Sequence, residues 1–159
     1  MKIYRKCAGI IVFNKEKKVL ICARNDARGY NWQFPQGGIE ANENPDEAAL
    51  RELKEETSVV SVKIIKTLTE ATRYDFPEEV LKKANGIGKN YAGQDVYWSL
   101  CYFLGTDEEI NLNTNNPEFK AFAWVEPDEA VNRIIDFKKD VYKTAIEKLG
   151  PVIKEYTAN

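Results

Sequence analysis

Apolar and polar positions alternate in blocks along the chain, and each block predicts an element of secondary structure. Residues 7–13 and 19–23 are apolar runs joined by a polar turn at 14–18, which predicts a β-hairpin. A short strand across 32–34 runs into a Pro-Gln-Gly-Gly loop at 35–38, because proline and glycine interrupt regular strands. The N-terminal quarter of the chain is therefore expected to be mostly sheet.

The clearest helix is predicted over residues 44–57. Asn44 suits the N-cap and Pro45 the first helical position, and Glu47 can complete a capping box with Asn44. Such paired start signals define where a helix begins more sharply than hydrophobic periodicity does.

Three β-rich segments and one more helix follow. The segments cover residues 59–68, 96–104 and 119–125. Both alternating faces of 96–104 are largely apolar, which indicates a strand in the middle of a mixed sheet. A last helix carries apolar residues at four-residue steps from 137 to 149, and Gly150-Pro151 is expected to end it. This order of elements favours an α+β fold class, with helices packed on a mixed sheet in one domain over residues 1–159.

Length, charge and hydropathy narrow the class of protein. The chain has 159 residues, of which 43% are hydrophobic, enough for one packed core. Its formal net charge of −2 argues against strong nonspecific attraction to nucleic acid. The sequence has neither a run of about 18 apolar residues nor a signal-like start, so we expect a cytoplasmic protein without a membrane partner.

Histidine and cysteine counts restrict the available chemistry. The sequence contains no histidine, which excludes Ser-His-Asp and Cys-His catalysis and metal sites with histidine ligands. The widely spaced Cys7, Cys22 and Cys101 predict buried, reduced thiols rather than disulfides. Carboxylates, hydroxyls, lysines and oxygen-bound metals remain as the chemical groups for a site.

Three glutamates on the first predicted helix carry the strongest chemical signal. At about 100° per residue, Glu52, Glu55 and Glu56 share one face, while Leu50 and Leu53 point toward a core. Three clustered anions repel one another, and a hard divalent cation such as Mg²⁺ or Mn²⁺ relieves that repulsion. The alternative is a solvated acidic face whose charges are paired with neighbouring cations.

From Gly37 to Val59 the chain resembles the signature of the Nudix hydrolases. The matching positions of this Nudix box are Gly37, Glu43, Arg51-Glu52-Leu53 and Glu55-Glu56. One position departs from the pattern, because the box normally ends with glycine before an aliphatic residue, and this chain has Ser58-Val59. If that position is left-handed, serine costs about 1 kcal/mol of stability there.

The resemblance implies a fold, an activity and a metal site. Nudix enzymes form an α/β/α sandwich around a mixed sheet, and they use Mg²⁺ or Mn²⁺ to cleave nucleoside diphosphates linked to another moiety. The implied metal ligands are Glu52, Glu55, Glu56 and the carbonyl oxygen of Gly37. Arg51 is implied as the ion-pair partner that holds these glutamates, and Glu43 as a support of the loop.

Further similarity, over about residues 4–149, points to one subfamily. The segments 32–38, 74–77, 117–119 and 137–142 resemble bacterial RNA pyrophosphohydrolases and plant-type diadenosine tetraphosphate hydrolases. In that subfamily the glutamate of the Pro-Glu-Phe segment approaches the metals, so Glu118 is the candidate general base. Glu56 is the second choice for the base, and a charged strand cap is the structural alternative for Glu118.

The same resemblance suggests residues that hold the substrate. These candidates are Arg5, Arg24, Tyr74, Phe137, Lys138 and Lys139. Tyr74 and Phe137 would stack a nucleobase, and the cations would contact phosphates. Core packing is the alternative for Phe137, and simple solvation is the alternative for Lys138 and Lys139.

These observations predict a metal-dependent enzyme that removes pyrophosphate from the 5′-triphosphate end of RNA and leaves a monophosphate. A dinucleoside polyphosphate such as diadenosine tetraphosphate is the close alternative, because both substrates present a base, a ribose and several phosphates. A catalytically silent nucleotide-binding domain is an alternative of another class, and Ser58 alone favours it. We expect a monomer whose partner is a nucleotide 5′-polyphosphate and that binds neither DNA nor membranes.

Overall fold

The predicted strands assemble into one mixed sheet. The computed structural model describes residues 2–25, 29–84, 91–134 and 138–158. Its strands are β1 (Ile3–Phe13), β2 (Val19–Arg24), β3 (Trp32–Gln33), β4 (Gln36–Gly38), β5 (Val62–Thr67), β6 (Thr72–Asp75), β7 (Tyr91–Phe103) and β8 (Phe119–Val125). Its helices are α1 (Pro45–Thr57), α2 (Glu78–Ala84), the 3₁₀ turn η1 (Asp107–Glu109), α3 (Pro127–Arg133) and α4 (Lys139–Glu155).

The long strands β1 and β7 run parallel at the centre of this sheet, and most of the other strands attach to them. The central order is β3-β2-β1-β7-β5, with β4 on β1, β6 on β7 and β8 on β2. Strands β1 and β2 form the predicted hairpin, with Phe13 opposite Val19. The expectation that residues 96–104 lie inside a mixed sheet is confirmed, because β7 has the parallel β1 on one side and antiparallel β5 and β6 on the other.

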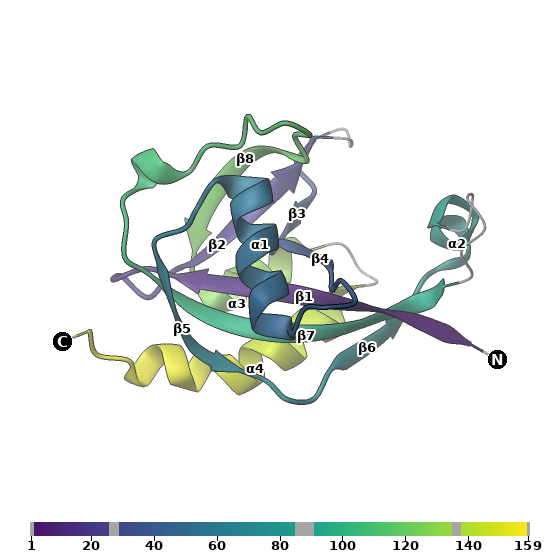
Figure 1. Ribbon diagram of the computed structural model, residues 1–159. Helices are drawn as coiled ribbons and strands as arrows, with labels where there is room; N and C mark the ends of the chain where they lie inside the picture. The colour runs from purple at the N-terminus through teal and green to yellow at the C-terminus, as the bar shows by residue number, and fades with distance from the viewer. Residues whose placement is uncertain (1, 26–28, 85–90, 135–137, 159) are drawn as a thin grey trace.

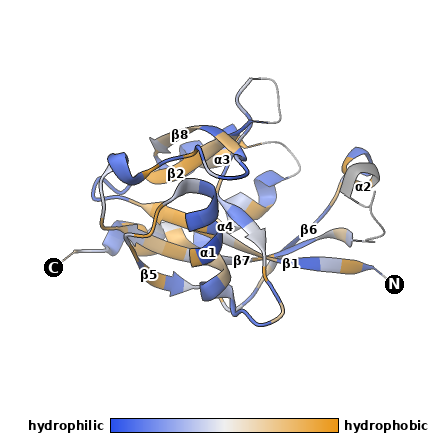
Figure 2. Ribbon diagram, turned by 45° about the horizontal axis from the view of Figure 1, so that its top comes forward, coloured by the Kyte–Doolittle hydropathy of each residue, from blue (hydrophilic) through white to orange (hydrophobic). Residues whose placement is uncertain are grey.

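Helices cover both faces of the sheet, as Figure 1 shows, with α1 on one side and α3 and α4 on the other. Alternate residues of β1 divide between two cores, because successive side chains of a strand point to opposite faces. Ile10 and Val12 pack with Leu53 of α1, whereas Ile11 and Phe13 pack with the residues of α3 and α4. The apolar colouring in Figure 2 follows the strands between these helices. The α/β/α arrangement implied by the resemblance is thus confirmed.

The structure corrects the expected end of the last helix. Gly150 and Pro151 do not stop α4, which continues to Glu155 with Pro151 inside it. Ile153 is buried in the core, and the ring of Tyr156 lies 5.3 Å from that of Phe13, between ring centroids. Burial of these two side chains offsets the cost of a proline in the helix.

The orientation of α1 also differs from the expectation in one respect. Leu53 is buried as predicted, but Leu50 is exposed. The side of α1 that faces the sheet carries Ala48 and Ala49, whose small side chains let the helix approach the strands closely. This rotation of the helix brings Glu56, rather than Leu50, to the buried side.

Two further features are the state of the cysteines and the apolar character of the helices. Cys7, Cys22 and Cys101 are buried and unbridged, as predicted. Over the described residues, no helix has the length and apolar character needed to span a membrane.

Candidate active site

Helix α1 presents the acidic face, and local interactions define both of its ends. Asn44 Oδ1 accepts a hydrogen bond of 2.8 Å from the Glu47 amide, and Glu47 Oε1 accepts one of 3.1 Å from the Asn44 amide. The predicted capping box is therefore formed, with Pro45 in the first turn. Ser58 ends the helix in the left-handed region, at φ 69°, and its amide donates to the Lys54 carbonyl.

The three glutamates of this face differ widely in burial. Glu56 is 4% exposed, the side chain of Glu52 is 15% exposed, and that of Glu55 is 58% exposed. The difference follows from their positions around the helix, because Glu56 lies one turn after the buried Leu53 whereas Glu55 lies toward solvent. Because Glu56 is the most buried of the three, it is also the hardest to keep charged.

Glu56 is an orphaned carboxyl group. Both of its oxygens are buried, and neither has a hydrogen-bond partner in the part of the chain that the structure describes. Burial, followed by the charges of Glu118 and Glu52, raises the pKa of Glu56 far above its ordinary value. Burial likewise raises the pKa of Glu52, although the Arg51 charge opposes that shift. A bound cation would stabilise the charged forms of both carboxyl groups.

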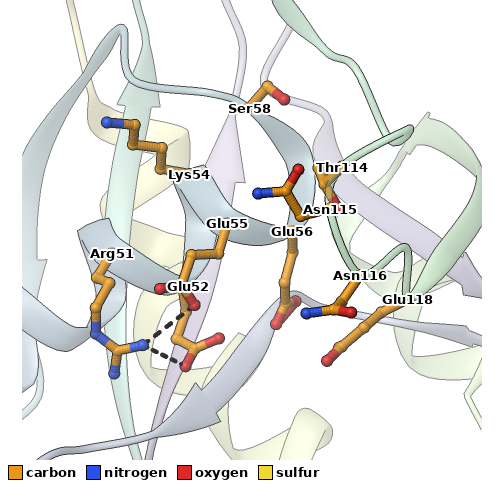
Figure 3. A pocket seen from close by; sticks show the side chains of 10 residues that line it. All are labelled: Arg51, Glu52, Lys54, Glu55, Glu56, Ser58, Thr114, Asn115, Asn116 and Glu118. Atoms are coloured by element: carbon orange, nitrogen blue, oxygen red, sulfur yellow. Dashed lines mark hydrogen bonds and ion pairs between the residues drawn. The ribbon is translucent and has the colours of Figure 1, made fainter.

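Arg51 ties the acidic face to the loop before the helix. Its Nε and Nη2 donate to the two carboxylate oxygens of Glu43, at 2.6 and 2.9 Å, and Nη2 also donates to the Gly38 carbonyl at 2.8 Å. Its Nη1 reaches Glu52 at 2.8 Å and Glu55 at 3.3 Å (Figure 3). The guanidinium lowers the pKa of Glu43 to about 2, so Glu43 stays ionised at neutral pH. Arg51 thus links Glu43 and the Gly38 carbonyl to the acidic face of α1.

Gly37 brings the backbone directly against this face. Strand β4 pairs antiparallel with β1, and Gly37 lies opposite Ala8. A methyl group on Gly37 would lie only 2.0 Å from the carboxylate carbon of Glu52, so any larger residue would displace that side chain. The backbone of Gly37 therefore lies against the Glu52 carboxylate, which makes its carbonyl oxygen a candidate ligand for a cation.

A cavity of about 740 Å³ separates α1 from the segment before β8. It is lined by Arg51, Glu52, Lys54, Glu55, Glu56, Ser58, Thr114, Asn115, Asn116 and Glu118. Figure 3 shows Glu118 on the wall opposite α1, with Glu52 and Glu56 facing it. The tertiary structure thus brings together carboxylates that are more than 60 residues apart in the chain.

Sequence reasoning missed the polar loop that forms the second wall of this cavity. Thr114, Asn115 and Asn116 line the cavity, and the hydroxyl oxygen of Thr114 is buried without a partner among the described residues. A run of Asn and Thr between strands is typical of any turn. Nothing in such a run indicates which wall of the fold it faces, so no sequence signal could have identified it.

The carboxylates are not arranged as a preformed cage. Among the described side chains, no set of three acidic, cysteine or histidine groups converges closely enough to hold a metal ion. Glu52 and Glu55 both pair with Arg51, whereas Glu56 does not, and all three line the cavity. This geometry suits Mg²⁺, which usually keeps several waters and completes its shell with substrate phosphates.

None of the candidate substrate residues that the structure describes lines this cavity. Tyr74 is buried, donates its hydroxyl to Gln94 Oε1 at 2.5 Å, and packs edge-on against Phe76. Its ring therefore offers no open face for a nucleobase in this structure. Lys139 lines a different groove, between α3 and α4. Phe137 lies outside the described residues.

The remaining candidates, Arg5, Arg24 and Lys138, also lie outside the lining of the cavity. Arg5 is exposed, and its guanidinium lies beside the backbone of Gly38. Lys138 is buried, and this burial, with the nearby charge of Arg24, lowers its pKa to about 8, while the charge of Glu56 opposes the shift. Arg24 and Lys138 therefore lie within electrostatic range of each other, and Lys138 also within range of Glu56.

The sheet is flanked by helices, and the glycines of β4 lie against an acidic helix, an arrangement that suits a cation and a phosphorylated ligand. Residues 3–145 match the family profile described as the NUDIX domain. The chain belongs to the NUDIX family, as its box predicted.

Relatives and solved structures agree with this assignment. The chain is 42% identical over 149 residues to the RNA pyrophosphohydrolase of Zymomonas mobilis subsp. mobilis, covering 92% of this chain and 95% of the relative. It is 45% identical over 153 residues to that of the Wolbachia of Brugia malayi, covering 95% and 92%. The Escherichia coli dihydroneopterin triphosphate pyrophosphohydrolase superposes with a TM-score of 0.68 over 92% of this chain and 99% of that one, at 16% identity, which shows the shared fold.

A plant relative matches as well. Nudix hydrolase 26, chloroplastic, of Arabidopsis thaliana is 42% identical over 144 residues, which cover 88% of this chain and 66% of the relative. The predicted subfamily, with bacterial and plant members, is therefore confirmed.

Proposed function

We propose that the protein is a metal-dependent hydrolase that removes pyrophosphate from the 5′-triphosphate end of RNA and leaves a 5′-monophosphate. The observation that carries this proposal is the buried carboxyl group of Glu56, which has no hydrogen-bond partner among the described residues and lies with Glu52 on one wall of a cavity, facing Glu118 on the other. Such a group suits a cation, and cations are what a polyphosphate substrate requires. The relatives named RNA pyrophosphohydrolase, at about 42% identity over most of the chain, support the choice of substrate.

The residues that would hold Mg²⁺ or Mn²⁺ are Glu52, Glu55 and Glu56, together with the carbonyl oxygen of Gly37. Glu55 would join this set by turning away from Arg51. Its side chain is exposed, and its contact of 3.3 Å is longer than that of Glu52 with the same guanidinium. When bound, the cation neutralises the phosphate chain and activates water. Arg51 keeps Glu52 in place while the substrate enters.

Glu118 is the proposed general base. It faces the acidic helix from the opposite wall, so a water molecule between them can contact both sides. This water attacks a phosphorus atom, its proton passes to the Glu118 carboxylate, and the bond to the bridging oxygen breaks as pyrophosphate leaves. Arg5, Arg24 and Lys138 contribute positive charge at the rim for the remaining phosphates.

We further propose a monomeric, cytoplasmic enzyme, with one domain over residues 1–159 and without DNA or membrane partners. Buried, unbridged Cys7, Cys22 and Cys101 suit a reducing compartment. A formal net charge of −2 suits an enzyme that recognises a phosphorylated end rather than a long nucleic acid.

The test compares variants of the two carboxylates on triphosphorylated RNA with Mg²⁺. Glu56→Gln should keep the fold and abolish turnover, because the neutral amide lacks the negative charge with which the carboxylate binds the cation. Glu118→Gln should lower kcat by about 10²–10⁴ while binding of the cation persists. Glu16→Gln, an exposed change in the β1–β2 turn, is the matched control and should keep the wild-type rate.

Three outcomes would contradict the proposal. Full activity of Glu56→Gln would disprove the metal assignment, and an unchanged rate in Glu118→Gln would move the base to another group. Fast hydrolysis of diadenosine tetraphosphate, with the RNA triphosphate left intact, would replace the proposed substrate.

A further inference from the structure

An exposed tyrosine ring stacks on a partly buried tryptophan outside the lining of the cavity. The rings of Tyr30 and Trp32 lie nearly parallel, at 14°, with centroids 5.6 Å apart. Trp32 belongs to β3 and is partly buried against the core, whereas Tyr30 is 66% exposed. A tyrosine this exposed buries little apolar surface, so the packing of the fold does not account for its position.

Cations flank both rings of this stack. The Lys120 ammonium lies 5.1 Å from the centroid of Tyr30, and the guanidinium carbon of Arg133 lies 5.7 Å from that of Trp32. Lys120 comes from β8 and Arg133 from α3, so separate segments of the chain converge here. Arg133 is also paired with Glu129, at 2.8 Å. Stacked rings bordered by cations are typical of surfaces that bind single-stranded nucleic acid.

The stack is connected to the proposed catalytic wall through β8. Lys120 follows Glu118 by two residues, which corresponds to roughly 7 Å along an extended chain. The amide of Asn25, at the end of β2, donates to the Glu118 carbonyl at 2.9 Å, and its side chain donates to the Pro117 carbonyl. The end of β2 is thus hydrogen-bonded to the backbone of Glu118, the residue proposed as the base.

We propose that Tyr30, Trp32 and Lys120 form a stacking platform for a nucleobase downstream of the triphosphorylated 5′ nucleotide. This inference rests on the proposed function. Every nucleobase has a π face, so a ring platform binds RNA with little sequence preference. Lys120 and Arg133 would then contact the phosphates that join the downstream nucleotides.

The platform would favour RNA over a dinucleoside polyphosphate as substrate. RNA continues on the 3′ side of its first nucleotide, whereas a dinucleoside polyphosphate has no nucleotide attached there. A stack placed beyond the catalytic wall therefore benefits only the RNA. An exposed pair of rings could also serve a protein partner, and the test below distinguishes that case.

The test measures kcat/KM for a length series: ATP and triphosphorylated RNAs of two, three and five nucleotides. For the wild type, kcat/KM should rise from ATP to the longer RNAs. Tyr30→Ala should remove that rise, with a loss of about 5- to 100-fold on the five-nucleotide RNA, the range expected for one stacked base. The loss should appear in KM, because stacking is equal in the ground and transition states.

Two variants serve as controls. Tyr30→Phe keeps the ring and should behave as the wild type on every substrate. Leu104→Ala removes an apolar side chain of similar exposure at another edge of the sheet and should change nothing. Binding of a 5′-monophosphorylated five-nucleotide RNA, measured by calorimetry beside AMP, gives a readout independent of turnover, and Tyr30→Ala should weaken only the RNA.

The outcomes separate this inference from the proposed function. If the wild type cleaves dinucleoside tetraphosphate and no triphosphorylated RNA, the proposed function fails. If it cleaves RNA and Tyr30→Ala matches it on five nucleotides, the platform is wrong, the ring pair serves another partner, and the proposed function stands. Equal losses on ATP and RNA would show that Tyr30 supports the catalytic site, which also overturns the platform.

Discussion

At the residue scale, Ser58 shows how one unusual position is accommodated. It stands where the Nudix box normally has glycine, and it adopts the left-handed conformation that glycine favours, at φ 69°. Its hydroxyl donates a hydrogen bond of 2.8 Å to the Asn111 carbonyl. This bond offsets part of the strain, which is about 1 kcal/mol for a residue with a Cβ.

A pair of substitutions at this position separates strain from hydrogen bonding. Ser58→Ala loses the bond and keeps the strain, so it should lower the free energy of unfolding by about 1 kcal/mol. Ser58→Gly loses the bond and also relieves the strain, so its stability should stay near that of the wild type. Urea denaturation measures both. Equal destabilisation by the two substitutions would mean that the left-handed backbone is not strained.

At the element scale, α4 continues past a residue that usually interrupts helices. Pro151 lacks the amide that would donate to the Glu147 carbonyl, and its ring crowds the preceding turn. The helix nevertheless reaches Ile153, which is buried, and leads to Tyr156, whose ring lies 4.8 Å from that of Tyr102, between centroids. The packing of Ile153 and Tyr156 therefore outweighs the tendency of proline to interrupt a helix.

Pro151→Ala tests this balance. The substitution restores a backbone hydrogen bond at an exposed position but adds conformational entropy to the unfolded chain, so it should stabilise the protein by about 1–2 kcal/mol. The midpoint of urea denaturation should rise without a change in m-value. An unchanged or lower midpoint would indicate that the helix ends near Gly150 in solution, as its sequence predicted.

At the scale of the whole molecule, burial of acidic groups links stability to pH. Burial raises the pKa of Glu56 above its ordinary value of 4.5, so the folded protein binds a proton that the unfolded chain releases. Without metal, the free energy of unfolding should therefore fall as pH rises above about 4.5, by at most about 1.4 kcal/mol per unit for one group. Glu52 acts in the same direction, because its pKa is also raised.

Denaturation in EDTA between pH 5.5 and 7.5 tests this linkage. The free energy of unfolding should decline with pH in the wild type and decline much less in Glu56→Gln. The range stays below 8 because burial lowers the pKa of Lys138 to about 8, which adds an opposite slope above that pH. Mg²⁺ should stabilise the wild type more than Glu56→Gln, since a ligand of the folded state raises its stability. Identical pH slopes in the two proteins would refute the assignment.

Much of the fold and of the acidic site could be predicted from local patterns. The capping box at Asn44 and Glu47 depends on residues three apart, and the shared face of Glu52 and Glu56 depends on helix geometry alone. The strand pattern of residues 96–104 likewise predicted a central strand, because apolar residues on both faces require cover on both sides.

Other features lie between segments that are far apart in the chain. The placement of Tyr74 in the core, the Thr114–Asn116 wall of the cavity and the approach of Lys120 to the Tyr30 ring each depend on contacts that no local pattern encodes. Short-range signals do not show which face of a loop or strand meets another element.

By itself, the sequence determined where α1 begins, which carboxylates share its face and to which family the chain belongs, because these depend on spacing along one segment. Only the tertiary structure decided that Glu56 is the buried member and Glu55 the exposed one. The reason is physical: the rotation of a helix about its axis is set by how its small residues, Ala48 and Ala49, pack on the sheet. Because of that rotation, Glu56 is the most buried of the three glutamates, and a cation can stabilise its charged form.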